Sequence, residues 1–239
     1  MKRTVLCFLL CAILAGCFSR QKYHHFQTKT PLPEGDVLVL GFLGGRQSWN
    51  SSSEGVRRLA LELRARNQPG LHVETIENVR RDLALRLVRN ALDRDRNDTL
   101  SENEKESARL ILYGQSFGGA AVVKFANQLQ HLKIPVLLTI QIDSVGRHDD
   151  VLPENVIAAA NLFQRNGIFI RGEPEIRAQN RSKTRIIGNF EFDYRNKRID
   201  LSSVPWYKKI FRTSHTKMNQ DPEVWEKVKE LILNTMNSF

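Results

Sequence analysis

Cysteine is scarce in this sequence, and the positions of the few cysteines restrict what the chain can do. Its 239 residues include three cysteines, Cys7, Cys11 and Cys17, all within the first seventeen positions. The chain that follows therefore offers no thiol for a disulfide, a cysteine metal site or a cysteine nucleophile. Any reaction that this part catalyses must depend on other side chains.

The first residues also lack an apolar run long enough to span a bilayer, which would take about 20 residues. Residues 5–14 form a shorter, almost unbroken apolar run, and Lys2 and Arg3 precede it. A short apolar run after a positively charged start is typical of a signal peptide. The segment therefore predicts export of the protein.

The run ends in Leu14-Ala15-Gly16-Cys17, which resembles the bacterial lipobox. In the lipobox the cysteine is acylated and becomes the first residue of the mature protein. The resemblance implies that residues 1–16 are a lipoprotein signal peptide and that acylated Cys17 anchors the protein to a membrane of the cell envelope, facing the periplasm or the exterior. An ordinary secretory signal with Cys17 as a bystander is the alternative.

The rest of the chain divides into a tether and one domain. Residues 17–34 are polar, contain Pro31 and Pro33 and show no helical or strand period, so we expect a tether. Residues 35–239 are long enough for one domain with a substantial core. The formal charge is +10, but the basic residues are scattered and no aromatic-interleaved basic block occurs, so no nucleic-acid partner is predicted.

Strand-like and helix-like segments alternate along the domain. We expect strands at 37–42, 71–76, 110–113, 136–142 and 185–192, and helices at 55–66, 81–92, 118–132, 155–163 and 222–236. This order predicts an α/β fold of three layers, a mostly parallel sheet with helices on both faces. Ligands of such sheets bind beyond the carboxyl ends of the strands, so chemistry is expected at Phe42, Ser116 and Asp143.

The most informative segment runs from Gly114 to Gly118, a complete G-x-S-x-G motif with Ser116 at its centre. An apolar strand precedes it and a helix rich in small residues follows. In this context the serine lies on a sharp, strained turn that exposes its hydroxyl, and the glycines let strand and helix approach closely. The segment predicts that Ser116 is a nucleophile.

With these residues the sequence resembles the α/β-hydrolase superfamily, particularly its lipase, esterase and thioesterase branches. A second match is Leu40-Gly41-Phe42, where the family has a His-Gly-aromatic turn. Leu40 departs from that histidine, which is not catalytic in the family. The resemblance implies that the backbone N–H groups of Phe42 and Phe117 form an oxyanion hole.

The resemblance also places a histidine after the serine, in a loop before the last helix, where His215 lies. His148 is the reserve candidate for the base. For the acid, Asp143 directly follows the buried strand at 136–142, where a carboxylate needs a functional partner. Asp193, one strand later, is the commoner family position and remains the alternative.

Together these residues predict a serine hydrolase that cleaves a small-molecule or lipid ester, or a thioester, through an acyl-enzyme on Ser116, with no cofactor required for catalysis. Two alternatives remain. One is a lipoprotein that uses the same fold to bind a ligand or partner without catalysis, and the other is a calcium-stabilised scaffold with a vestigial elbow.

Residues 93–104 resemble an EF-hand calcium loop. Asp93, Asp95, Asn97 and Thr99 supply oxygen ligands at alternating positions, and Glu104 occupies the final one. Asp98 replaces the usual glycine, and two arginines reduce the negative charge of the loop. The loop predicts a structural calcium ion; the alternative is a solvated turn in which Ser101 and Glu104 form a capping box.

Overall fold

The computed structural model describes residues 21–167, 170–202, 204–206, 209 and 213–238 and has a parallel sheet at its centre. The strands are β1 (Val37–Leu43), β2 (Leu71–Glu77), β3 (Leu110–Gln115), β4 (Val136–Ile142), β6 (Val156–Phe163) and β8 (Arg185–Glu191). They lie in the order β2-β1-β3-β4-β6-β8, and every neighbouring pair is parallel. The predicted α/β fold class is confirmed.

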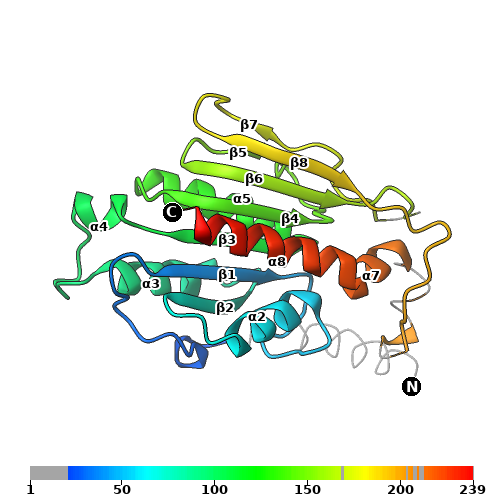
Figure 1. The fold of residues 1–239 in the computed structure, drawn as a ribbon, viewed down its shortest axis with the longest axis horizontal. Coiled ribbons are helices and arrows are strands. Elements are labelled where there is room, and N and C mark those ends of the chain that lie inside the picture. The colour runs from blue at the N-terminus through cyan, green and yellow to red at the C-terminus, as the bar shows by residue number, and fades with distance from the viewer. Residues whose placement is uncertain (1–20, 168–169, 203, 207–208, 210–212, 239) are drawn as a thin grey trace, which may run out of the picture.

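Helices cover both faces of this sheet. On one face lie α2 (Gly55–Ala65) and α8 (Pro222–Asn237), and α8 crosses in front of the strands in Figure 1. On the other lie α3 (Arg81–Leu92) and α5 (Phe117–His131). The chain moves outward from β1 to β2 and then returns past β1 to β3. Because parallel crossovers are right-handed, this change of direction puts α2 and α3 on opposite faces.

The inner strands are apolar on both sides because each side contacts helices. Every residue of β1, β3 and β4 is buried. Along β1, Leu38, Leu40 and Phe42 pack toward α3 and α5, whereas Val37 and Val39 pack toward α2 and α8. Continuous apolar runs are the expected signature of strands buried in this way.

The helix predicted at residues 155–163 is wrong, because these residues form strand β6. The segment contains Ala158, Ala159 and Ala160, and alanine favours helices in isolation. A short apolar run, however, does not distinguish a buried strand from a helix by its period. Here pairing with β4 on one side and β8 on the other fixes the extended conformation.

The predicted tether also differs from what the structure shows, since residues from Gln21 onward pack against the domain. The Gln21 amide donates to the Thr75 carbonyl at 2.7 Å and accepts from the Glu77 backbone N–H at 3.0 Å. A short 3₁₀ helix, η1 (Tyr23–His25), follows, and the His25 ring stacks on Trp49 with 4.4 Å between centroids. Residues 1–20, including Cys17, lie outside the described residues.

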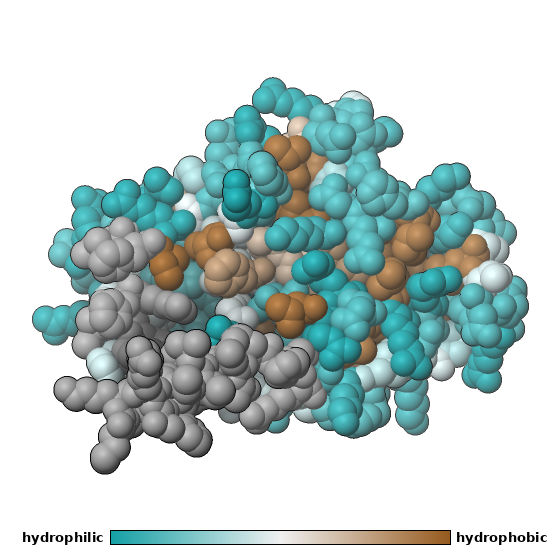
Figure 2. Space-filling model, turned by 180° about the vertical axis from the view of Figure 1, so that it is seen from behind, coloured by the Kyte–Doolittle hydropathy of each residue, from teal (hydrophilic) through white to brown (hydrophobic). Residues whose placement is uncertain are grey.

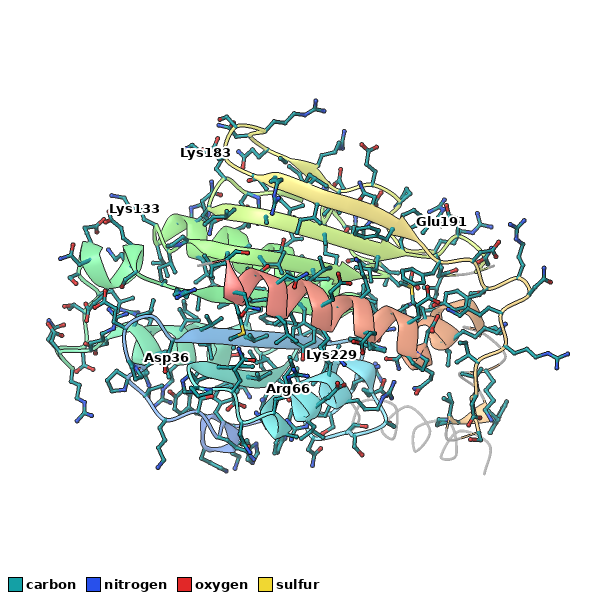
Figure 3. The ribbon with its side chains drawn as sticks, viewed as in Figure 1. Asp36, Arg66, Lys133, Lys183, Glu191 and Lys229 are labelled. Carbon is teal, nitrogen blue, oxygen red and sulfur yellow. The ribbon has the colours of Figure 1, made fainter. Side chains whose placement is uncertain are left out.

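Charged side chains project around the outside of the ribbon, as Lys133, Lys183 and Glu191 do in Figure 3. The face opposite to that of Figure 1 is mostly hydrophilic, with apolar residues emerging between polar ones (Figure 2). Across the front face, Lys229 of α8 pairs with Glu62 of α2 at 2.6 Å. Among the residues described, no helix combines the length and apolar character needed to cross a membrane.

Candidate active site

Ser116 lies on a sharp turn between β3 and α5. Its backbone has φ +59° and ψ −126°, in the left-handed half of conformational space that a residue with a side chain rarely adopts. A Cβ on Gly118 would lie 2.0 Å from the Phe42 carbonyl oxygen, and one on Gly114 would lie 2.4 Å from the Gly118 carbonyl oxygen. Both positions therefore require glycine, and the close packing that results holds Ser116 in its strained conformation.

The predicted base and acid are in contact. His215 lies on α7 (Thr213–Gln220), and its Nδ1 is 2.6 Å from Asp143 Oδ2. Both side chains are buried. Asp143 directly follows β4, and its backbone N–H donates to the Leu162 carbonyl at 2.7 Å. The fold thus brings together two residues that are 72 positions apart in the sequence.

A second side chain fixes the Asp143 carboxylate. Gln164, the residue after β6, donates from Nε2 to both carboxylate oxygens, at 3.0 Å to Oδ2 and 3.3 Å to Oδ1. On the opposite side, a Cβ on Gly172 would lie 2.2 Å from Oδ1. A fully buried carboxylate is costly unless it accepts hydrogen bonds. Gln164 and His215 satisfy this need, and both hold the carboxylate in one orientation.

The structure does not bring the alternative residues to this site. Asp193 is on the surface, where Arg195 binds its carboxylate at 2.5 Å and lowers its pKa to about 2 through hydrogen bonds. Arg195 is therefore the partner of the Asp193 carboxylate. His148 is exposed, in a loop after β4. Of the two acids considered, Asp143 is therefore the one that contacts His215.

Ser116 and His215 both line one cavity of about 810 Å³. It lies beyond the carboxyl ends of β1 and β3, where the direction of strand connection changes and where ligands of such sheets bind. Its wall is mixed: Arg46, Ser48, Ser51, Thr216 and Gln220 contribute polar groups, and Val204, Pro205 and Phe117 contribute apolar surface. The cavity therefore offers both polar and apolar contacts to a ligand.

Phe117, the first of the two predicted oxyanion donors, directly follows Ser116 and begins α5. The first backbone N–H groups of a helix have no partner within the helix and favour negative charge. The predicted turn at Phe42, the second proposed oxyanion donor, is corrected by the structure. Phe42 lies inside β1, paired with Ile76 and Gly114, because the strand continues through Leu43.

Gly44 is the first residue after β1, and it lines the cavity together with Gly45. A Cβ on Gly44 would lie 3.1 Å from Ser116 Cβ, so the Gly44 backbone is close to Ser116. The turn that begins at Gly44, two residues later than predicted, is the part of the chain that could supply the second oxyanion donor.

A partly buried hydrogen-bond network beside this turn, whose side chains also line the cavity, is a feature that sequence reasoning missed. The Gly44 N–H donates to Gln47 Oε1 at 2.8 Å, and the Gln47 amide donates to the Glu54 carboxylate. Asn219, four residues after His215 on α7, donates to the same carboxylate at 2.8 Å. The network joins the turn at Gly44 to the helix that carries His215. Glu54 and Asn219 are 165 positions apart, so no local sequence pattern indicates it.

The predicted calcium loop places three of its five proposed ligand residues together. One carboxylate oxygen each from Asp93, Asp95 and Glu104 lie within 4.8 Å of one another. Asp98 has φ +64°, the left-handed conformation for which an EF-hand loop normally uses glycine. The carboxylate set therefore suits a hard cation such as calcium.

The remaining contacts of this loop match the alternative prediction. Ser101 and Glu104 form a reciprocal capping box at the start of α4 (Glu102–Glu106), with the Ser101 N–H donating to Glu104 Oε2 at 2.9 Å. These hydrogen bonds lower the pKa of Glu104 to about 2. Asn97 accepts from the backbone N–H of Thr99 at 2.8 Å. The capping box is confirmed, and calcium binding stays a prediction.

No protein-family model matches this chain, and no curated protein matches it. Its function has to be inferred from the residues of the site itself.

Proposed function

We propose that the protein is a membrane-tethered serine hydrolase that cleaves a carboxylic ester or thioester through an acyl-enzyme on Ser116. One observation carries this proposal. A strained Ser116 lines the same cavity as His215, and Nδ1 of His215 is hydrogen-bonded to the buried Asp143. A nucleophile, a base and a group that orients the base are the parts that acyl transfer by serine requires.

The first step forms the acyl-enzyme. Asp143 accepts a hydrogen bond from the Nδ1–H of His215, which keeps the ring proton on Nδ1 and leaves Nε2 free to act as a base. Nε2 takes the proton of the Ser116 hydroxyl while Oγ attacks the substrate carbonyl. His215 then gives that proton to the leaving alcohol or thiol. In the second step a water molecule is activated in the same way and releases the acyl group.

The tetrahedral intermediate needs donors for its oxyanion. The Phe117 N–H at the first turn of α5 is the first donor, and the turn that begins at Gly44 supplies the second. Removing one such donor typically costs about two to three orders of magnitude in kcat. No cofactor is needed for any of these steps.

Membrane attachment is the second part of the proposal. The lipobox-like motif that ends at Cys17 supports acylation of that cysteine and a location in the cell envelope. Acylation would hold the catalytic domain at a membrane of the envelope.

Covalent labelling tests the hydrolase assignment. A fluorophosphonate probe should label the wild-type protein and a Ser51→Ala control, in which another serine of the cavity wall is removed. Ser116→Ala should not be labelled although it stays folded. If the folded wild-type protein resists the probe, the hydrolase proposal fails and the binding-module and scaffold alternatives are favoured. If Ser116→Ala still reacts, another residue is the nucleophile.

A further inference from the structure

Residues 21–28 shorten the connection between the proposed lipid anchor and the domain. Gln21 is fastened to the end of β2, and only residues 18–20 separate it from Cys17. Four residue steps span at most about 14 Å even when fully extended. An acyl chain on Cys17 would therefore hold the surface around Gln21 close to the membrane, rather than at the end of a long tether.

That surface adjoins the cavity that contains Ser116. Gln21 binds β2 at Thr75 and Glu77, near the carboxyl end of the strand. The Thr75 hydroxyl donates to the Trp49 carbonyl at 3.0 Å. Trp49 belongs to the segment between β1 and α2 that supplies much of the cavity wall. The attachment point and the cavity thus lie at the same edge of the sheet.

Exposed apolar side chains gather at this edge. Val79, Phe117 and Trp206 are 63%, 54% and 69% exposed, more than any other large apolar residue that the structure describes. Val79 follows the end of β2, Phe117 lines the cavity beside Ser116, and Trp206 follows Pro205 of the cavity wall. Tryptophan favours the interface between water and lipid, and apolar side chains beside it can be buried at the boundary of the headgroups. We call these three residues the apolar rim.

Basic residues accompany the rim. Lys22 lies beside the attachment point and Arg46 lies on the wall of the cavity, and both are exposed. Anionic lipid headgroups attract such residues. The cavity wall combines polar residues with the apolar Phe117, Val204 and Pro205, and Trp206 of the rim directly follows Pro205. This arrangement suits an ester presented among headgroups.

We propose that the mouth of the Ser116 cavity faces the membrane and that the substrate is an ester or thioester carried at the headgroup level of that membrane. The inference rests on the proposed hydrolase function and on acylation of Cys17. It adds how the domain is oriented relative to the membrane and that the substrate is part of the membrane rather than dissolved in water.

A linker insertion tests the proposal. The acylated full chain is placed in vesicles of phosphatidylcholine and phosphatidylglycerol, and a flexible Gly/Ser segment of about 20 residues is inserted between Ser19 and Arg20. Hydrolysis of a lipid that carries a fluorogenic ester on its headgroup should fall about fifteenfold, since effective concentration declines with roughly the −3/2 power of tether length. Hydrolysis of soluble p-nitrophenyl acetate should not change. The same segment added after Phe239 is the control and should affect neither rate.

Fluorescence quenching tests the orientation of the domain independently of activity. Brominated lipids in the vesicles should quench the fluorescence of Trp206, and Trp206→Phe should remove most of that quenching. Val79→Ser should lower the rate on the lipid ester and leave the rate on the soluble ester unchanged.

The outcomes separate this inference from the proposed function. If the wild-type protein neither hydrolyses the soluble ester nor reacts with a fluorophosphonate, the hydrolase assignment fails. If it does both, but the insertion before Arg20 leaves the ratio of the two rates unchanged, the membrane-facing orientation is overturned. Absence of Trp206 quenching, or of acylation at Cys17, overturns the orientation whatever the activity.

Discussion

Replacing Asp143 with asparagine changes one atom of a buried carboxylate and tests the proposed role of this residue. Gln164 presents an N–H to the carboxylate and competes with His215 for its acceptors. An asparagine has one acceptor oxygen. In the position of Oδ1 it would accept from both the backbone N–H and the Nε2 of Gln164, which lie 3.4 and 3.3 Å from Oδ1. The NH₂ group of the new side chain would then face His215 Nδ1 and donate to it.

This reversal would put the imidazole in the wrong tautomer. His215 would carry its proton on Nε2, the nitrogen that must accept the proton of Ser116. In serine proteases the equivalent change lowers kcat by about four orders of magnitude. The same loss is expected here, and it corresponds to about 5 kcal/mol of transition-state stabilisation. The assay is the kcat for a chromogenic ester, with urea unfolding to confirm that the variant is folded.

Asp193→Asn is the matched control, because Asp193 is an exposed carboxylate paired with Arg195. Its kcat should stay within twofold of that of the wild-type protein. A folded Asp143→Asn variant whose kcat falls less than tenfold would refute the role given to Asp143. A large loss in Asp193→Asn would assign the role of the acid to Asp193 instead of Asp143.

The remaining predictions concern the elbow, the acidic loop and the signal sequence. Gly118→Ala should lower the free energy of unfolding in urea by about 3 kcal/mol, because the added methyl group would overlap the Phe42 backbone. A hundredfold excess of calcium over its Kd should stabilise the domain by about 2.7 kcal/mol and raise its Tm, and Glu104→Gln should remove this response. The pKa of Glu104 is lowered from 4.5 to about 2, so its contribution to stability is complete above pH 4.5 and is lost as the pH falls toward 2. Acid titrations of the wild-type protein and Glu104→Gln should therefore diverge above about pH 2. Cys17→Ser should abolish metabolic labelling by a fatty-acid analogue.

Each of these can fail separately. An unchanged urea midpoint in Gly118→Ala would mean that α5 does not pack against β1 as described. A Tm that millimolar calcium leaves unmoved would make the acidic loop a capped turn only, and the hydrolase proposal would be unaffected. Parallel acid titrations would contradict the depressed pKa of Glu104. Persistent fatty-acid labelling in Cys17→Ser would exclude that cysteine as the site of acylation.

The parts of the fold that were predictable from sequence are those with local signals. The buried strands are continuous apolar runs, and the elbow at Ser116 combines a short motif with a strand before it and a helix after it. The chain order of serine and histidine alone predicts His215 as the base, and the structure shows its contact with Asp143. Local pattern and chain order therefore indicate the chemistry.

The features that the sequence does not predict depend on partners that are distant along the chain. Residues 155–163 extend because β4 and β8 pair with them, and their alanines suggested the opposite. The strand at Phe42 continues to Leu43 because β2 offers a further partner there, and this moves the turn near Ser116 to Gly44. Gln164 was not singled out, since nothing in the sequence near it points to Asp143, 21 positions away.

The packing of residues 21–28 has a consequence for one edge of the sheet. Strand β2 is an edge of the sheet, and an open edge can pair with the edge of another molecule. The Gln21 amide bonds the backbone of β2 at two points, much as a neighbouring strand would, and the Gln27 and Thr28 N–H groups bind the carboxylate of Glu74. Glu74 is also a buried charge in an edge strand, a device that discourages pairing between sheets. Residues 21–28 thus cover the edge of the sheet at β2. A variant that begins at residue 35 would expose the backbone of β2, and this edge could then pair with other molecules and aggregate.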